Sequence, residues 1–134
     1  MDLKNYFEKT RGMGVLSTAD DQGRVNAAVY ARPRVLEDGS LAFIMRDRLT
    51  HHNLQSNPHA AFLFHEKGPG YKGVRLHLTR IREESDTELV KELCRRCKID
   101  GKADAVRFLV AFRIDKERPL IGPGEEPAEP TGGS

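Results

Sequence analysis

The sequence lacks any long hydrophobic run. No stretch approaches the roughly 20 consecutive apolar residues that a membrane-spanning helix needs, and the N-terminus has no apolar core of signal-peptide length. We therefore expect a cytoplasmic protein that does not insert into a membrane. The 134 residues suit a single domain, which is long enough to bury a core but leaves much of its surface in water.

The chain also lacks an excess of charge of either sign. Its 22 basic and 20 acidic residues give a formal net charge of +2 and are spread along the whole sequence. A protein that follows a nucleic acid backbone usually carries a broad basic face, because lysine and arginine bind the phosphates. Nucleic acid is therefore not an expected partner.

Cysteine is scarce, with only Cys94 and Cys97 present. Their Cys-x-x-Cys spacing occurs in redox pairs and in half of a zinc site, but no second Cys or His pair is placed to complete four ligands. No strand leads directly into the motif, and the surrounding apolar spacing is that of an amphipathic helix. We interpret them as two helix thiols that pack as small hydrophobic side chains and expect no metal site. A zinc-binding interaction protein is the alternative.

What the sequence does have is a series of short apolar or alternating segments separated by turn signals. The expected strands are 15–19, 24–31 (resumed at 34–36 after Pro33), 41–45, 59–65, 74–81 and 106–114. Short helices are expected over 2–10, from Thr50 to about Ser56, and from about residue 86 to Lys98. This pattern favours a mainly β protein, a six-stranded antiparallel barrel with peripheral helices, over a doubly wound parallel sheet. Such a small barrel binds ligands in an outer groove or at a subunit boundary.

Two features refine these boundaries. Residues 74–81 alternate strictly until Arg80 and Ile81, where the break in phase predicts a bulge or a turn out of the sheet. From Pro119 onward Gly, Pro and Glu dominate and no apolar periodicity remains. We therefore assign residues 1–118 to the folded domain and 119–134 to a flexible tail without catalytic residues.

The junction between an apolar strand and a short helix, within residues 41–58, is the most informative stretch. The strand breaks into Arg46, Asp47 and Arg48, and Thr50 follows as the predicted N-cap of the helix. Free backbone N–H groups, the positive end of the helix dipole, two guanidinium groups and a hydroxyl would all point at one anion. We therefore predict a phosphate site here. The alternative is an ordinary capped helix with two solvated arginines.

Two neighbouring segments would complete a ligand site. The strand at 24–31 alternates apolar Val25, Ala27 and Val29 with small or polar residues, so a flat ligand can approach its backbone. The glycine-rich loop at 66–73 is long enough to contact a ligand, although it would serve equally as a plain connector.

These residues resemble the pyridoxamine 5′-phosphate oxidase-like FMN-binding split-barrel family, nearest to its small FMN-binding-protein branch. The resemblance rests on the order of elements, the strand Arg24-Val-Asn-Ala-Ala-Val29, the segment Arg46–Leu54 followed by Asn57-Pro58, and the loop Gly68-Pro-Gly70, and it covers roughly residues 3–115. It implies a split barrel that forms a homodimer with two FMN sites at the subunit interface.

The resemblance also implies which residues bind FMN. The phosphate is expected at the basic turn and helix start, the isoalloxazine ring along the small-residue strand, and one loop contact from the partner chain. The expected residues are Arg46, Arg48, Leu49, Thr50 and Asn53 for the turn and helix, Asn26, Ala27, Ala28 and Val29 for the ring, Ile44 and Met45 beside the ring, and Tyr71 from the partner chain.

Two departures from the family narrow the expected function. Many relatives place a Lys at or beside the helix start, where this chain has Leu49 and His51. In this chain arginine must therefore neutralise the charge of the phosphate. True pyridoxamine phosphate oxidases also carry basic residues toward their C-terminus that bind the substrate phosphate, whereas this chain ends in a tail rich in Pro, Glu and Gly. Vitamin B6 oxidation is therefore not the expected activity.

In a flavoprotein of this kind the flavin carries the redox step, so no catalytic side chain is assigned. His51 and His52 are candidates for stabilising reduced flavin or relaying a proton, and ordinary exposed histidines are the alternative. We expect an FMN-dependent oxidoreductase or flavin electron carrier with a small-molecule or protein electron donor. The alternative is a non-catalytic module that holds another phosphorylated cofactor, of deazaflavin or tetrapyrrole type, or no cofactor.

Overall fold

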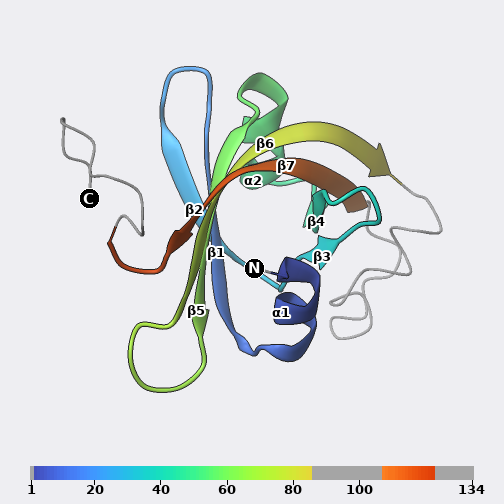
Figure 1. Cartoon of the computed structure of the whole chain (residues 1–134). Coiled ribbons are helices and arrows are strands. Elements are labelled where there is room, and N and C mark those ends of the chain that lie inside the picture. Colours follow the sequence, from blue (N-terminus) through green and yellow to red (C-terminus); the bar gives the residue numbers. More distant parts are fainter. Residues whose placement is uncertain (1, 86–106, 123–134) are drawn as a thin grey trace.

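The structure, a computed structural model, describes residues 2–85 and 107–122. Within these ranges the chain forms two helices and seven strands. They are α1 (Leu3–Lys9), β1 (Gly12–Ala19), β2 (Val25–Tyr30), β3 (Arg34–Val35), β4 (Leu41–Arg46), α2 (Leu49–Ser56), β5 (His59–Glu66), β6 (Gly73–Ser85) and β7 (Arg107–Pro119). The strands form one antiparallel sheet in the order β2-β1-β5-β6-β7-β4-β3. The sheet curls into a half-barrel (Figure 1).

This architecture confirms the predicted mainly β, antiparallel split-barrel fold with peripheral helices, but six strands were too few. Residues 34–35 pair with Ala42 and Leu41 of β4 and therefore form a separate edge strand, β3, rather than a continuation of β2. Pro33 lies between the two segments, and proline has no N–H group with which to continue a strand ladder. The sequence shows the interruption at Pro33, whereas only the structure shows that β2 pairs with β1 and β3 pairs with β4.

The long antiparallel pair β6 and β7 extends beyond the predicted ends of both strands. β6 continues to Ser85, and shifts in its register with β7 lie between His77 and Leu78 and between Arg80 and Arg82. The second shift confirms the bulge predicted at Arg80 and Ile81. Bulges bend a strand and increase its twist, so they let this pair curve around the core.

The core lies on the inner face of the curled sheet and is rich in phenylalanine. Phe43 packs against Phe62 with ring centroids 4.9 Å apart and against Phe112 at 5.7 Å. The helix predicted over residues 2–10 is confirmed as α1, and its Leu3 and Phe7 side chains are buried in the same cluster. Each fully buried side chain of this size stabilises the fold by about 1.5–3 kcal/mol.

The two edges of the sheet approach each other across the core, on opposite sides of the split. Tyr30 of β2 meets Phe43 of β4 edge-on, with centroids 5.9 Å apart, although these strands are not neighbours in the sheet. α2 and the turn between β1 and β2 lie together at one end of the barrel, and the loop between β5 and β6 extends at the other (Figure 1). The ends of the barrel therefore have different surroundings.

Several predictions fall outside the described residues. The helix predicted from residue 86 to Lys98, with Cys94 and Cys97, lies there, and so do tail residues 123–134. These remain predictions. At the tail boundary, Pro119 is the last residue of β7.

Candidate functional site

α2 begins directly after β4, but its first residue and its cap differ from the prediction. The N-cap is Arg48, which makes no side-chain capping hydrogen bond, and the helix starts at Leu49. The predicted N-cap, Thr50, was wrong: it lies in the first turn, is only 3% exposed, and its hydroxyl accepts a 3.4 Å hydrogen bond from the Asn26 side chain. The reason is local, because a tight turn with a 2.9 Å bond from the Arg48 N–H to the Arg46 carbonyl starts the helix early.

The inner face of α2 is fastened to the β1–β2 hairpin. The Asn53 amide donates a 3.1 Å hydrogen bond to the Thr18 hydroxyl, and both side chains are buried. At the end of the helix, the Asn57 amide donates to the Asp20 backbone carbonyl at 3.4 Å. α2 and the hairpin therefore form two walls held at a fixed distance.

His51 also lies on the inner face of α2, against the long strands. Its ring stacks on Phe108 with centroids 3.9 Å apart and planes 10° from parallel. Its Nε2 atom is 2.9 Å from the Glu83 carboxylate, and Gln55 donates to the same carboxylate at 3.2 Å. The side chain is buried and ties the helix to β6 and β7, so it is not one of the ordinary exposed histidines considered from the sequence.

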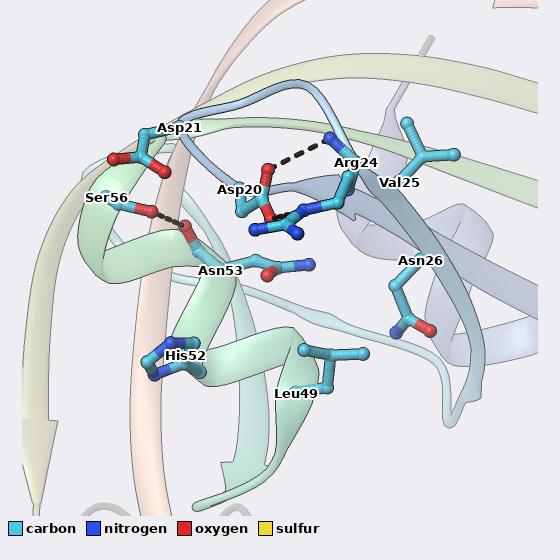
Figure 2. Close-up of a pocket in the computed structure, with 9 residues that line it drawn as sticks. All are labelled: Asp20, Asp21, Arg24, Val25, Asn26, Leu49, His52, Asn53 and Ser56. Atoms are coloured by element: carbon cyan, nitrogen blue, oxygen red, sulfur yellow. Dashed lines mark hydrogen bonds and ion pairs between the residues drawn. The ribbon is translucent and has the colours of Figure 1, made fainter.

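A pocket of about 540 Å³ opens between α2 and the hairpin (Figure 2). Its volume falls within the roughly 300–1,000 Å³ typical of small-molecule sites. It is lined by Asp20, Asp21, Arg24, Val25, Asn26, Leu49, His52, Asn53 and Ser56. The lining combines apolar, amide, acidic and basic groups, which suits a ligand with a flat body and polar edges.

The hairpin side of the pocket is organised by an ion pair between Asp20 and Arg24. The Arg24 Nε atom donates to Asp20 Oδ2 at 2.7 Å, and the backbone N–H groups of Gln22 and Arg24 both donate to Asp20 Oδ1 at 2.9 Å. These contacts, with the backbone bond from Arg24 the largest, lower the pKa of Asp20 below its ordinary value. The carboxylate is therefore ionised at neutral pH and offsets the charge of Arg24.

The three residues predicted for the phosphate differ in burial and orientation, although Arg48 and Thr50 both lie beside the Tyr30 hydroxyl. On β4, Arg46 is paired with Arg107 and points to the face opposite Met45, whereas Thr50 is buried beneath β2. Arg48 is exposed at the turn, where its charge acts on the Tyr30 hydroxyl. Burial raises the pKa of Tyr30, and the hydrogen bond with Thr50 and the charge of Arg48 oppose that rise.

The predicted ring residues are divided between two faces of β2. The half-buried Asn26 and Ala28 face inward, whereas Ala27 and Val29 are exposed on the outer face. This reverses the simple expectation that the more apolar face of an alternating strand is the buried one. Of this group, Asn26 lines the pocket.

The remaining predicted residues also occupy different surroundings. Met45 is 1% exposed in the main core, and Ile44 packs on the other face of β4 against a small cluster with Leu109. Leu49 and Asn53 line the pocket. Tyr71 is 74% exposed in the β5–β6 loop, at the far end of the barrel from the pocket (Figure 1).

Sequence reasoning missed the acidic and basic residues of the hairpin, and Ser56. Asp20, Asp21 and Arg24 were assigned only to a turn and a strand, although Arg24 is the first residue of the motif that carried the family resemblance. The available signal was the number of charges beside that turn. It did not show that the turn folds over α2, because that contact joins residues 37 positions apart.

In residues 2–85 and 107–122, no three His, Cys, Asp or Glu side chains come close enough to hold a metal ion. The zinc alternative depends on Cys94 and Cys97, which lie outside those ranges, so it is untested. No helix among the described residues has the length and apolar character needed to cross a bilayer.

Comparison with known proteins identifies the relatives of this chain. The pyridoxamine 5′-phosphate oxidase family matches residues 4–119. A search of curated proteins finds no match.

Three solved structures illustrate the shared fold. An FMN-binding protein from Syntrophomonas wolfei subsp. wolfei has a TM-score of 0.70 at 18% identity, covering 89% of this chain and 84% of that chain. An F420 reductase has a TM-score of 0.68 at 16% identity, covering 85% and 94%. HutZ, the heme storage protein from Vibrio cholerae, has a TM-score of 0.64 at 18% identity, covering 86% and 90%. At these identities the likeness shows the fold alone.

Proposed function

This chain belongs to the pyridoxamine 5′-phosphate oxidase family, and from this premise we propose that it is a flavoprotein that binds FMN between α2 and the β1–β2 hairpin. The observation that carries the proposal is the pocket of about 540 Å³ built jointly by β2 and α2. Proteins of the same fold described as an FMN-binding protein and an F420 reductase support a flavin-type ligand.

The residues of the pocket fit the chemical parts of FMN. Arg24 and His52 are its two basic side chains and would face the phosphate. The Asn26 side chain offers an amide donor and acceptor for the polar edge of the ring, and the 54% exposed Leu49 offers an apolar surface for its face. When bound, FMN supplies the redox chemistry.

We infer from this that the protein acts as an FMN-dependent oxidoreductase or as a flavin electron carrier, with a small-molecule or protein electron donor. The pocket side chains have no nucleophile with an adjacent base, so their part is to bind and orient the flavin and to exclude water from its ring. His52 is the one imidazole among the lining residues and is the group that would hold a proton near the ligand.

A homodimer is part of the proposal and rests on the outer face of β2, β1 and β5. The strand register places Val15 between Val29 and Leu63, which are 61% and 41% exposed. Val25 and Met13 on the same strands are also exposed. A second copy that covers this face would bury several large apolar side chains and would bring the partner's β5–β6 loop into reach of the site.

A tetrapyrrole-binding module is the second candidate, because HutZ has the same fold. The two functions differ in colour. Bound oxidised flavin absorbs at about 450 nm, whereas bound heme gives an intense Soret band.

Titration with FMN tests the main proposal. The purified protein should quench flavin fluorescence with one FMN per chain, and mass spectrometry of ligand released on denaturation should detect FMN. A correctly folded protein that leaves the fluorescence of FMN unchanged contradicts the proposal. Stoichiometric heme binding by that same protein would favour the second candidate.

A further inference from the structure

Near the start of β6 and the end of β7, four basic side chains lie on one face of the sheet. Arg75 is directly opposite Arg118 in the strand register, and His77 is directly opposite Lys116. Opposite residues of an antiparallel pair, and residues two positions apart on one strand, project from the same face. These four residues therefore form one group on the surface, which we call the basic strip.

Arg75 and Arg118 place like charges directly opposite each other in the basic strip. Opposite residues of an antiparallel pair have Cβ atoms about 5 Å apart, and like charges at this separation destabilise the sheet. Asp115 on β7 carries a negative charge, but its carboxylate already accepts hydrogen bonds from Arg113 Nε at 2.7 Å and from the Thr79 hydroxyl at 2.5 Å. An anion that bound to the strip would offset the repulsion between its cations.

The cations of the basic strip also act on His77. Partial burial lowers the pKa of His77 below its ordinary value, and the positive charges of Arg118, Arg75 and Lys116 lower it further, whereas Asp115 raises it. The imidazole therefore lies in a positive electrostatic environment. His77 is exposed and the other three side chains are half-buried, so a ligand can reach the strip from solvent.

The dimensions of the basic strip suit a small anion. Neighbouring strands lie about 5 Å apart, and alternate residues of one strand lie about 7 Å apart, so the strip can surround one diphosphate group. A stable interface with another protein buries about 1,600 Å², which is far more than this cluster covers. On β5, Leu63 and Ala61 are opposite Arg75 and His77, and they offer a small apolar surface for the flat base of a nucleotide.

We propose that the basic strip binds the diphosphate group of a nucleotide or dinucleotide. Arg75 and Arg118 bind the phosphate oxygens with their guanidinium groups, Lys116 supplies a further positive charge, and His77 donates a hydrogen bond. None of these four residues lines the pocket between α2 and the β1–β2 hairpin. The inference therefore does not require that the pocket binds a flavin.

Three variants test the basic strip. Lys116→Gln and Arg118→Gln each remove one positive charge and keep a long polar side chain, and His77→Gln replaces an exposed imidazole. Arg75 is left unchanged because it donates hydrogen bonds to backbone carbonyls at and beyond the end of β7. Lys4→Gln, at an exposed position of α1, is the matched control because it removes an equal charge elsewhere.

Isothermal titration calorimetry of the full chain measures dissociation constants for ADP, pyrophosphate, AMP and adenosine, after thermal melts show that each variant is folded. ADP and pyrophosphate should bind to the wild-type protein at low salt, AMP should bind about tenfold more weakly, and adenosine should not bind. Lys116→Gln and Arg118→Gln should each weaken ADP binding about fivefold to tenfold, and Lys4→Gln should change it by less than about twofold. The NMR signals of the His77 ring, identified by their absence from the His77→Gln spectrum, should show a rise in the pKa of His77 when pyrophosphate binds.

A folded wild-type protein that binds neither ADP nor pyrophosphate overturns this inference. Equal losses in Lys116→Gln and Lys4→Gln would show a general effect of charge and would also overturn it, as would a single-stranded oligonucleotide that binds more tightly than ADP. The FMN titration is judged separately. FMN binding without ADP binding contradicts this inference and leaves the proposed function standing, whereas ADP binding without FMN binding supports this inference and contradicts the proposed function.

Discussion

The Asn53 amide of α2 donates a hydrogen bond to the Thr18 hydroxyl of β1 at 3.1 Å, and both side chains are only 3% exposed. This bond joins the helix to the strand that leads into the hairpin, and so it sets the width of the pocket. The two walls of the pocket come from segments that are distant in the chain, and buried hydrogen bonds such as this one hold the two walls together.

Removing the Asn53 amide should therefore destabilise the protein and loosen the pocket. Asn53→Ala leaves the Thr18 hydroxyl buried without this partner, which should reduce the free energy of unfolding by about 1–3 kcal/mol. FMN affinity should fall as well, because the two walls are no longer fixed. Urea unfolding and flavin titration measure these effects. Ser56→Ala, at an exposed pocket position of the same helix, is the control and should unfold within about 0.5 kcal/mol of the wild type.

The two adjacent histidines should differ sharply in their effect on stability. His51→Ala removes a ring stacked on Phe108 and the partner of Glu83, so the free energy of unfolding should fall by about 2–3 kcal/mol. His52→Ala should change it by less than about 0.5 kcal/mol, because His52 is exposed. Chemical denaturation of both variants provides the comparison. Equal losses would contradict the placement of His51 beneath the helix.

Acid should weaken the fold through aspartates in the turns. Hydrogen bonds with Arg24 and Gln22 lower the pKa of Asp20, and those with Ser40 and Arg82 lower that of Asp38, both below their ordinary value of 3.8. A carboxyl whose pKa is lower in the folded state stabilises the fold above 3.8, and this stabilisation is lost as pH falls through the folded value. Melting temperature should therefore drop below about pH 4, and less steeply in Asp38→Asn. A flat profile down to pH 2 would show that these bonds do not form in solution.

The exposed apolar face of β2, β1 and β5 should mediate formation of the homodimer. Val29→Lys or Leu63→Lys places a charge on either side of Val15 and should convert a dimer to monomers in light scattering and sedimentation experiments. Ile81→Lys, at another exposed apolar position on β6, is the control and should leave the assembly unchanged. A wild-type protein that is monomeric at all accessible concentrations would remove the dimer from the proposal.

Variants of two arginines test whether the FMN phosphate binds in the pocket or at the basic turn predicted from the sequence. Arg24→Gln should weaken FMN binding by about 1 kcal/mol, because the phosphate then faces the carboxylate of Asp20 without a compensating cation. Arg46→Gln should have little effect, since Arg46 points to the other face of the sheet. Isothermal titration calorimetry measures both. A larger loss of FMN affinity in Arg46→Gln than in Arg24→Gln would show that the phosphate binds at the turn at residues 46–48.

The sequence by itself was sufficient for the fold class and most of the strands. The strict alternation of residues 74–79 and the turns that contain Gly23 and Gly39 depend on local rules, in which side chains alternate across a strand and glycine adopts a positive φ. Both glycines have φ above +80° and lie among the turn signals that separate the strands in the sequence. The break at Arg80 and Ile81 was visible for the same reason.

Only the tertiary structure decided which residues share a site. The face to which Arg46 points is set by its pairing with β7, and the pocket exists because the hairpin at residues 20–26 folds over α2. Neither relation has a local signature, since both depend on contacts between segments distant in the chain. The sequence therefore determined strands, turns and family, whereas long-range pairing and burial decided that Arg24 and Asp20, rather than Arg46 and Thr50, line the pocket.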